Sequence, residues 1–305
     1  MINTLKRLIF VSAMLLAIAI PAYTLLVFHS PSPTTVYPLD ITKVRTLANS
    51  LPGDKPRAVR YENITAFEFA EAMVVAGDPW KKTAIPVYSY QLVYPTQTLI
   101  VDTAMNREIA KPDFMIKMFD DAAYQRMNAA MEKASQIVIT HEHMDHIGGL
   151  AAHPHLSKLL PAVRLTEEQI NNPAGMKPAV FPDGALKDVK PLHFDDLLAI
   201  APGVVLLKSP GHTPGSQMVY VQLADGRELL LLGDVCWHLR NVELVRERPL
   251  FMTAIIGENR EQVLAEFQTL HDLQQAHPEV HLVPGHDGTV IESLTRSGLL
   301  QAGFQ

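Results

Sequence analysis

The chain has 305 residues, of which 48% are hydrophobic and 19% are charged, enough for one large domain or two small ones around a buried core. The net charge is −6, and no basic cluster stands out beyond Arg240, Arg246 and Arg248, so a nucleic-acid partner is not expected. Cys236 is the only cysteine, which excludes an intramolecular disulfide.

The first 28 residues are typical of a membrane segment. Lys6 and Arg7 precede 21 uncharged residues, 8–28, which as a helix would span roughly 30 Å, about one bilayer core. Because basic residues stay inside, an uncleaved anchor would place the rest of the chain outside the cytoplasm, on the periplasmic side in a bacterium. A signal peptide cleaved after Ala19 is the alternative and would give a secreted or periplasmic protein. The anchor is favoured, because cleavage there would leave the apolar residues 20–28 on the mature chain.

A proline-rich linker and a short lead-in segment, residues 29–56, are predicted to join this segment to a domain over residues 57–305. Strands and helices alternate through that domain, which indicates an α/β sandwich without settling its topology. Helical spacing and a capping-box pattern mark the helices, and β-branched runs and a hairpin signal mark the strands. The predicted helices cover 41–50, 120–134 and a segment that opens at Asn259, and the predicted strands cover 87–94, 98–103, 136–140, 217–223, 228–232 and 281–283.

Residues 140–149, THEHMDHIGG, hold four potential metal ligands directly after a predicted strand. In an extended segment His141 and His143 project to the same side, because side chains alternate with period two. Asp145 and His146 are adjacent and point in different directions. That arrangement favours two metal ions side by side over one ion that takes all four ligands. Imidazole and carboxylate ligands without thiolate suit zinc, with manganese and iron as alternatives.

Three later positions extend this set. His212 lies in SPGHTPGS, a loop fixed by prolines and glycines; Asp234 ends an apolar strand; and His286 follows a strand and a tight turn in VPGHDG. Each alone is more typical of an ordinary turn. Together with the first cluster they supply seven ligands at loop positions after strands, where sites on layered α/β folds gather.

With these motifs in this order, residues 99–288 resemble the metallo-β-lactamase fold superfamily, and more closely its hydrolase branches that include glyoxalase II and the acyl-homoserine lactonases. The resemblance implies a four-layer αββα sandwich, here following an N-terminal transmembrane helix, with two divalent ions, zinc before manganese or iron, at one edge. It also implies that Asp102, in IVDT, orients a ligand histidine. The implied ligands are His141, His143 and His212 for one ion and Asp145, His146 and His286 for the other, with Asp234 bridging the two.

The expected reaction is hydrolysis, in which a hydroxide that bridges the two ions attacks the carbonyl carbon of an ester, lactone or amide-type substrate. Asp145 is the predicted catalytic residue, because a ligand carboxylate near the water can take or relay a proton. Trp237 and His238 are predicted to line the pocket, and residues 240–256 to form an apolar wall or lid.

Other residues receive plainer interpretations. Cys236 is expected to be a small buried hydrophobe, although it could also line the pocket. His153 and His155 are expected at the surface, with an additional metal site as the alternative.

The small-molecule substrate itself stays open. The acyl-homoserine lactonases resembled here usually carry a tyrosine three residues after the bridging aspartate, where this chain has Trp237. Residues 211–216 also resemble one subclass of true β-lactamases. Basic residues for glutathione are not evident, and the chain is not basic enough for a nucleic-acid phosphodiester. The alternative of a different class is a non-catalytic, metal-binding membrane module, which the intact ligand set disfavours.

Overall fold

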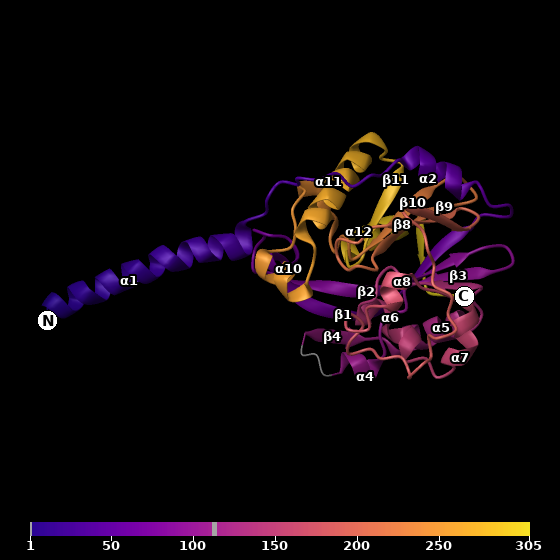
Figure 1. The fold of residues 1–305 in the computed structure, drawn as a ribbon, viewed down its shortest axis with the longest axis horizontal. Coiled ribbons are helices and arrows are strands. Elements are labelled where there is room, and N and C mark those ends of the chain that lie inside the picture. Colours follow the sequence, from indigo (N-terminus) through magenta and orange to yellow (C-terminus); the bar gives the residue numbers. More distant parts are fainter. Residues whose placement is uncertain (1, 112–114) are drawn as a thin grey trace.

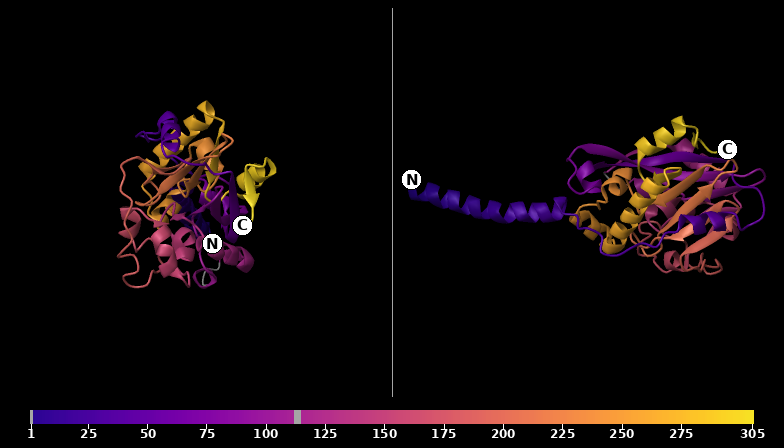
Figure 2. Two further views of the ribbon diagram at one scale, coloured as in Figure 1. Left: turned by 90° about the vertical axis from the view of Figure 1, so that its right-hand side faces the viewer. Right: turned by 90° about the horizontal axis from the view of Figure 1, so that it is seen from above.

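A computed structural model describes residues 2–111 and 115–305 of the chain. One long helix projects from a body that is built on two β-sheets, as Figure 1 and Figure 2 show from three directions. The first sheet has the order β12-β1-β2-β3-β5-β6, with β4 paired to β1, and the second has the order β11-β10-β9-β8-β7. The strands of the first sheet are β1 (Ala58–Ala70), β2 (Lys82–Val93), β3 (Thr98–Val101), β4 (Ile116–Phe119), β5 (Gln136–Val138), β6 (Val163–Arg164) and β12 (Leu300–Ala302), and those of the second are β7 (Leu197–Ala201), β8 (Val204–Lys208), β9 (Gln217–Gln222), β10 (Glu228–Gly233) and β11 (Val280–Pro284).

Helices cover the outer faces of both sheets (Figure 1). The helices α2, α9 and α11 lie on the second sheet, α5 and α6 lie on the first, and α12 contacts strands of both. The helical segments are α1 (Ile2–Tyr23), the π-helical turn η1 (Thr24–Phe28), α2 (Ile41–Ala48), α3 (Glu71–Val74), α4 (Arg107–Ala110), α5 (Asp121–Met131), α6 (Met144–Ala151), α7 (Leu156–Leu159), the 3₁₀ turn η2 (Leu160–Ala162), α8 (Glu167–Ile170), α9 (Leu239–Leu244), α10 (Leu250–Ile256), α11 (Arg260–Ala276) and α12 (Gly288–Arg296).

The sandwich follows from strands that are apolar on both faces. In β8, Val204 and Leu206 pack between the sheets, whereas Val205 and Leu207 pack against the outer helices. Successive side chains of a strand point to opposite faces, so a continuous apolar run must be covered on both sides. The predicted layering of helix, sheet, sheet and helix is therefore present.

Local signals predicted where the helices begin more accurately than where they end. Asn259 caps α11, since its side chain accepts the backbone N–H of Gln262, and the predicted inner residues Val263, Phe267 and Leu270 are buried. Helix α5 is shorter than predicted, because Asp120 caps its start and the chain turns after Met131. The predicted strands are all present. Their bounds agree with the prediction to within two residues, except that β2 starts five residues earlier than predicted.

The predicted linker, residues 29–56, is not a free spacer. It contains α2, and its extended part lies along the body: the hydroxyl of Tyr37 donates to the carbonyl oxygen of Lys208 at 2.7 Å, and Thr269 donates to the carbonyl oxygen of Tyr37 at 2.9 Å. Residues that are distant in the sequence thus hold this segment against the domain. Its prolines alone had predicted only an extended linker.

One surface prediction was wrong. His153 is buried, and its Nδ1 accepts the backbone N–H of His155 at 3.1 Å. It follows Ala152, the C-cap of α6, and its backbone N–H donates to the carbonyl oxygen of Leu150 at 3.2 Å, so the turn folds back on the buried helix. His155 is exposed, as predicted, and pairs with Glu132 at 2.6 Å.

Candidate metal centre

The seven predicted ligands converge on one place, where strand ends from both sheets meet. His141, His143, His212 and Asp234 form one group, and Asp145, His146, Asp234 and His286 form a second. Within each group the potential ligand atoms lie within 4.8 Å of one another. Asp234 belongs to both groups, so its carboxylate lies between two positions that could each hold a cation.

Two glycines, Gly285 in the turn after β11 and Gly149 in α6, allow the strand ends to approach this closely. Strands β10 and β11 are parallel neighbours, so Asp234 and His286 follow their carboxyl ends at the same edge of the sheet. A Cβ atom on Gly285 would lie 2.5 Å from Oδ1 of Asp234, which is too close for any other residue. Gly149 is restricted in the same way by the carbonyl oxygen of Thr103, at 1.9 Å. These glycines keep the two groups of ligands adjacent.

Three of the histidines are oriented from behind by a contact to their other ring nitrogen. Nδ1 of His146 lies 2.9 Å from Asp102, Nδ1 of His286 lies 2.7 Å from the carbonyl oxygen of Pro86, and Nδ1 of His212 lies 2.6 Å from Glu258. Each contact leaves Nε2 facing the centre. Oxygen acceptors of this kind are the usual support for metal-binding imidazoles.

Asp102 occupies a strained position at the end of β3. Its φ is +61°, a left-handed conformation that is uncommon for a residue with a side chain. Its carboxylate also accepts the backbone N–H and the hydroxyl of Thr140, at 2.7 and 2.8 Å. The predicted orienting contact to a histidine is present, and the histidine is His146.

The electrostatics of the site fit a pair of cations. Burial, reinforced by the neighbouring imidazole of His212, lowers the pKa of His143 to about 4, so its ring is neutral and free to ligate near pH 7. Burial opposes the charged form of Asp234, but the surrounding His286 and His146 hold its pKa well below the usual range. Oδ1 of Asp234 and Nε2 of His146 are buried and lie 3.1 Å apart, but neither atom makes a hydrogen bond. Bound cations would satisfy both atoms.

Two buried side chains that the sequence analysis did not place at the metal centre support it. Arg248 donates to the carbonyl oxygen of Asp234 at 2.7 Å, and its guanidinium lies 4.6 Å from the ring centre of Trp237. It also forms an ion pair with Glu258, the carboxylate behind His212. The pair brackets α10, since Arg248 precedes the helix and Glu258 follows it. Only tertiary contacts identify these residues, because Arg248 and Glu258 lie in no recognisable motif.

Glu142, inside the first motif, is also buried and is not part of either ligand group. Its carboxylate accepts the hydroxyl of Thr213 at 2.8 Å and the side-chain N–H of Asn172 at 2.7 Å. It thereby fixes the loop that carries His212.

The residues predicted to line the pocket, Trp237 and His238, lie in different places, and only Trp237 reaches the metal centre. Trp237 lies at the centre, where its indole N–H donates to Oδ2 of Asp234 at 2.7 Å. His238 turns away, pairs with Asp287 at 3.2 Å and lines a separate pocket of about 230 Å³. Cys236 is buried, as expected of a small hydrophobe, and burial raises its pKa far above the range of a reactive thiol.

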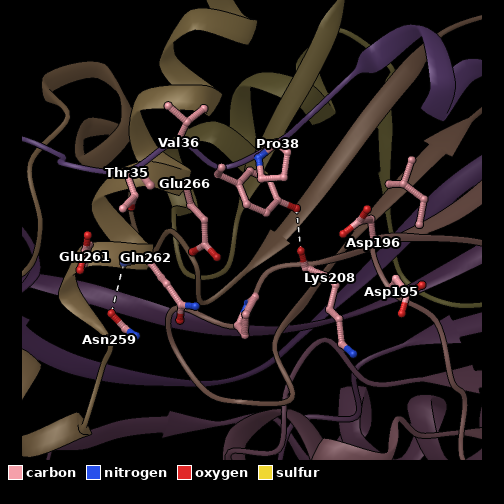
Figure 3. A pocket seen from close by; sticks show the side chains of 14 residues that line it. Thr35, Val36, Pro38, Asp195, Asp196, Lys208, Asn259, Glu261, Gln262 and Glu266 are labelled. Atoms are coloured by element: carbon pink, nitrogen blue, oxygen red, sulfur yellow. Dashed lines mark hydrogen bonds between the residues drawn. The ribbon is translucent and has the colours of Figure 1, made fainter.

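A larger pocket of about 490 Å³ lies beneath the extended N-terminal segment and beside α11 (Figure 3). Its lining contains none of the seven predicted ligands. It includes Glu266, whose Oε1 accepts the backbone N–H of Gly211 at 3.2 Å, next to His212 in the chain. Burial raises the pKa of Glu266 to about 8. This pocket therefore borders Glu266, which holds the loop of His212, and does not reach the candidate ligands themselves.

Taken together, the sandwich and the paired His/Asp groups define a metal-binding hydrolase. The chain belongs to the metallo-beta-lactamase superfamily, whose family model matches residues 83–286. An N-acyl homoserine lactonase of Bacillus thuringiensis is 24% identical over 180 residues, which cover 54% of this chain and 70% of the relative. A probable metallo-hydrolase of Mycobacterium tuberculosis is 27% identical over 203 residues, which cover 59% of this chain and 64% of the relative.

Solved structures share the same fold. An N-acyl homoserine lactone hydrolase with the product N-hexanoyl-L-homoserine bound at its catalytic metal centre superposes with a TM-score of 0.62. The two are 17% identical, and the match covers 78% of this chain and 96% of that one. AidC, described as a dizinc quorum-quenching lactonase, gives a TM-score of 0.54 at 12% identity and covers 77% of this chain and 90% of its own. At these identities the likeness supports the fold.

Proposed function

We propose that this protein is a two-metal hydrolase of small carbonyl substrates, with residues 57–305 as its catalytic domain. One ion is assigned to His141, His143 and His212, the other to Asp145, His146 and His286, and Asp234 to both. The observation that carries this proposal is the sharing of the Asp234 carboxylate by two preformed ligand groups. The imidazole-rich, thiolate-free ligand set favours zinc.

When bound, the two ions would supply Lewis acidity and a lowered pKa for water. The residues of the chain position the reactants. The Asp145 carboxylate is the most exposed of the site's carboxylates, and its Oδ2 lies 3.7 Å from Nε2 of both His146 and His286. We assign it the acceptance of a proton from the water that attacks the substrate carbonyl, followed by transfer of that proton to the leaving alkoxide oxygen.

Lactones and simple esters are the proposed substrate class. The lactonases among the similar proteins support it. Trp237 is a difference from the lactonases in how a substrate could be held. Its indole N–H donates to Asp234, and it has no phenol hydroxyl to offer the substrate. We therefore expect substrate orientation to depend on the shape of the apolar wall more than on a hydroxyl donor.

We further propose that α1 and η1 anchor the protein in a membrane with the catalytic domain outside the cytoplasm. Among the described residues, one helix, Lys6–Phe28, is long and apolar enough to cross a bilayer. Val27, near its end, is buried against the domain, and its carbonyl oxygen accepts the N–H of Gly77 at 3.0 Å. This docking supports retention of the segment, because the end of the helix is part of the domain's packing.

Metal analysis followed by a substrate panel tests the proposed function. The purified full chain should retain about two equivalents of zinc. It should hydrolyse a γ-lactone or an ester in preference to a chromogenic cephalosporin, an acyl thioester and a phosphodiester. Preference for the cephalosporin would instead identify a β-lactamase. Two bound ions without activity would identify a non-catalytic module, and a chain that retains no zinc, manganese or iron would overturn the proposal.

A further inference from the structure

The end of the proposed anchor is fixed to one face of the catalytic domain by aromatic contacts. The indole N–H of Trp80 donates to the hydroxyl of Tyr23 at 2.6 Å, and Tyr23 packs edge-on against Phe28 at 5.4 Å between ring centres. Trp80 in turn stacks on Phe251 of α10, at 6.4 Å. The anchor therefore leaves the domain beside α10, as Figure 1 and Figure 2 show.

Helix α10 lies between this anchor and the metal centre. Just before the helix, Arg248 donates to the carbonyl oxygen of Asp234. Just after it, the carboxylate of Glu258 contacts Nδ1 of His212. Met252, on its inner side, belongs to the same apolar cluster as Trp237. One short helix thus touches η1 with its outer face and the metal-site core with its inner face.

The outer face of α10 exposes apolar side chains that no element of the domain covers in the described part of the chain. Ile255 of α10 is 75% exposed, and Trp80, which precedes β2 and stacks on Phe251 of α10, is 54% exposed. Lys81 and Lys82 follow Trp80 and pair with Glu71 and Glu68, so the charge at this edge is nearly balanced. Tryptophan and tyrosine at the end of an apolar span, with charged groups beside them, are the pattern of a membrane–water interface.

The length and composition of residues 6–28 favour a bilayer as the occupant of this face. If residues 6–28 cross the membrane, Tyr23 lies at the depth of the lipid headgroups, within the last turns of the span. The hydrogen bond to Tyr23 then brings Trp80 to the same depth, and stacking brings Phe251 with it. No flexible spacer separates the span from the domain, because Val27 is already buried in it.

We propose that the face formed by Tyr23, Trp80, Phe251 and Ile255 sits in the headgroup layer of the membrane, and that α10 admits to the metal centre esters or lactones whose apolar chain is dissolved in that layer. The inference rests on the proposed function and anchor. It adds a substrate class, namely amphiphiles that reach the site from the bilayer.

The two tryptophans give a direct test of the membrane contact. The full chain is reconstituted in phosphatidylcholine vesicles with either ordinary or dibrominated acyl chains. Bromine quenches only indoles that contact lipid, so wild-type emission should fall roughly twofold in brominated vesicles through the exposed Trp80. Trp80→Phe, which leaves only the buried Trp237, should lose this quenching. Equal emission in both lipids, or equal quenching in Trp80→Phe, would overturn the placement.

A second experiment tests the substrate class. The ratio of kcat/KM for 4-nitrophenyl dodecanoate to that for 4-nitrophenyl acetate is measured in plain phosphatidylcholine vesicles. Ile255→Asp should lower this ratio roughly tenfold, because a charge on the outer face of α10 repels the apolar chain. Val180→Asp is the matched control, since Val180 is 70% exposed on the segment between α8 and β7. An unchanged ratio in Ile255→Asp would overturn entry along α10.

The two failures are distinguishable. A metal-loaded wild type that hydrolyses neither ester would count against the proposed function, while quenching of Trp80 would still report the membrane contact. Loss of activity in Ile255→Asp on both esters, in detergent as well as in vesicles, would show that α10 serves the site without the membrane, and would overturn the inference.

Discussion

Asp234 is the single residue on which both candidate metal positions depend. Its Oδ1 lies 3.1 Å from His146 Nε2 and 3.0 Å from His286 Nε2, and its Oδ2 lies 3.6 Å from His212 Nε2. A carboxylate that is shared in this way keeps the two positions at a fixed separation. The charge of Asp234 is therefore as important to the centre as its position.

Asp234→Asn tests this dependence. The amide keeps the size of the side chain but removes the negative charge that offsets two cations, so bound metal should fall below one ion per chain and hydrolysis by roughly 10³-fold. Elemental analysis and ester turnover measure the two effects. Asp225→Asn, on the exposed β9–β10 turn, is the control and should change neither. A variant that retains two ions would contradict the assignment.

Trp237 acts on Asp234 through one hydrogen bond. Trp237→Phe keeps an aromatic ring over Arg248 but leaves Oδ2 of Asp234 without its 2.7 Å donor. The expected result is roughly 10-fold weaker metal binding, the usual effect of losing a support to a ligand. Titration with a competing chelator measures it. If activity fell while metal affinity stayed the same, Trp237 would contact substrate instead.

Glu266 connects the stability of the domain to pH. Burial raises the pKa of its carboxyl to about 8 from 4.5 in a solvated chain, so between these values the folded protein holds a proton that the unfolded chain has released. The stabilising effect of that proton is complete below pH 4.5 and is lost as pH rises through 8. Glu266→Gln should therefore match the wild type in thermal stability near pH 5 and exceed it near pH 9. Calorimetry across this range, at constant zinc, measures the two melting temperatures. If they changed in parallel with pH, the raised pKa of Glu266 would be contradicted.

At the scale of elements, the Arg248–Glu258 ion pair joins the segments that precede and follow α10 and so fixes both ends of the helix. Both side chains are completely buried, so each needs the other to remain ionised without a large penalty. Glu258 also faces Nδ1 of His212 at 2.6 Å. The pair therefore links the position of a metal-site wall to the orientation of a ligand.

Glu258→Gln should disturb both functions of the pair. The amide cannot neutralise the buried guanidinium, so the free energy of unfolding should fall by about 3 kcal/mol, and metal affinity should fall roughly 10-fold as His212 loses its anionic partner. Denaturant melts of the metal-free and metal-loaded protein separate the two effects. Glu261→Gln, on the exposed side of α11, is the control. Equal losses with and without metal would restrict Glu258 to packing.

Elements with local signals could be predicted, and those fixed by distant partners could not. The cap at Asn259 and the period-two faces of β8 are visible within a few residues of sequence. The seven candidate ligands could be predicted because each follows a strand in a motif. Arg248 and Glu258 were not, since their partners Asp234 and His212 lie in other elements. His153 was placed at the surface because nothing local indicates that its turn is covered.

For the whole molecule, the boundary between the apolar N-terminal helix and the domain is the decisive feature. The exposed part of α1 makes no contribution to the domain's core, whereas Val27 is buried and Ser30 accepts the backbone N–H of Glu247 at 3.2 Å. The packing of the domain thus begins within the apolar N-terminal segment, about thirty residues before the predicted start at residue 57. Removing different lengths of the N-terminus should reveal this boundary.

Two truncations locate it. Deletion of residues 2–19 removes exposed apolar surface and should leave the melting temperature of the domain unchanged in mild detergent. Deletion of residues 2–30 also removes Val27 and leaves the N–H of Gly77 without its acceptor, so it should cost about 2–4 kcal/mol of unfolding free energy. Melting curves of both, compared with the full chain at equal zinc, measure the difference. If the two truncations were equally stable, the segment from Ile20 to Ser30 would be a tether rather than part of the fold, and the domain would be free to move away from the membrane.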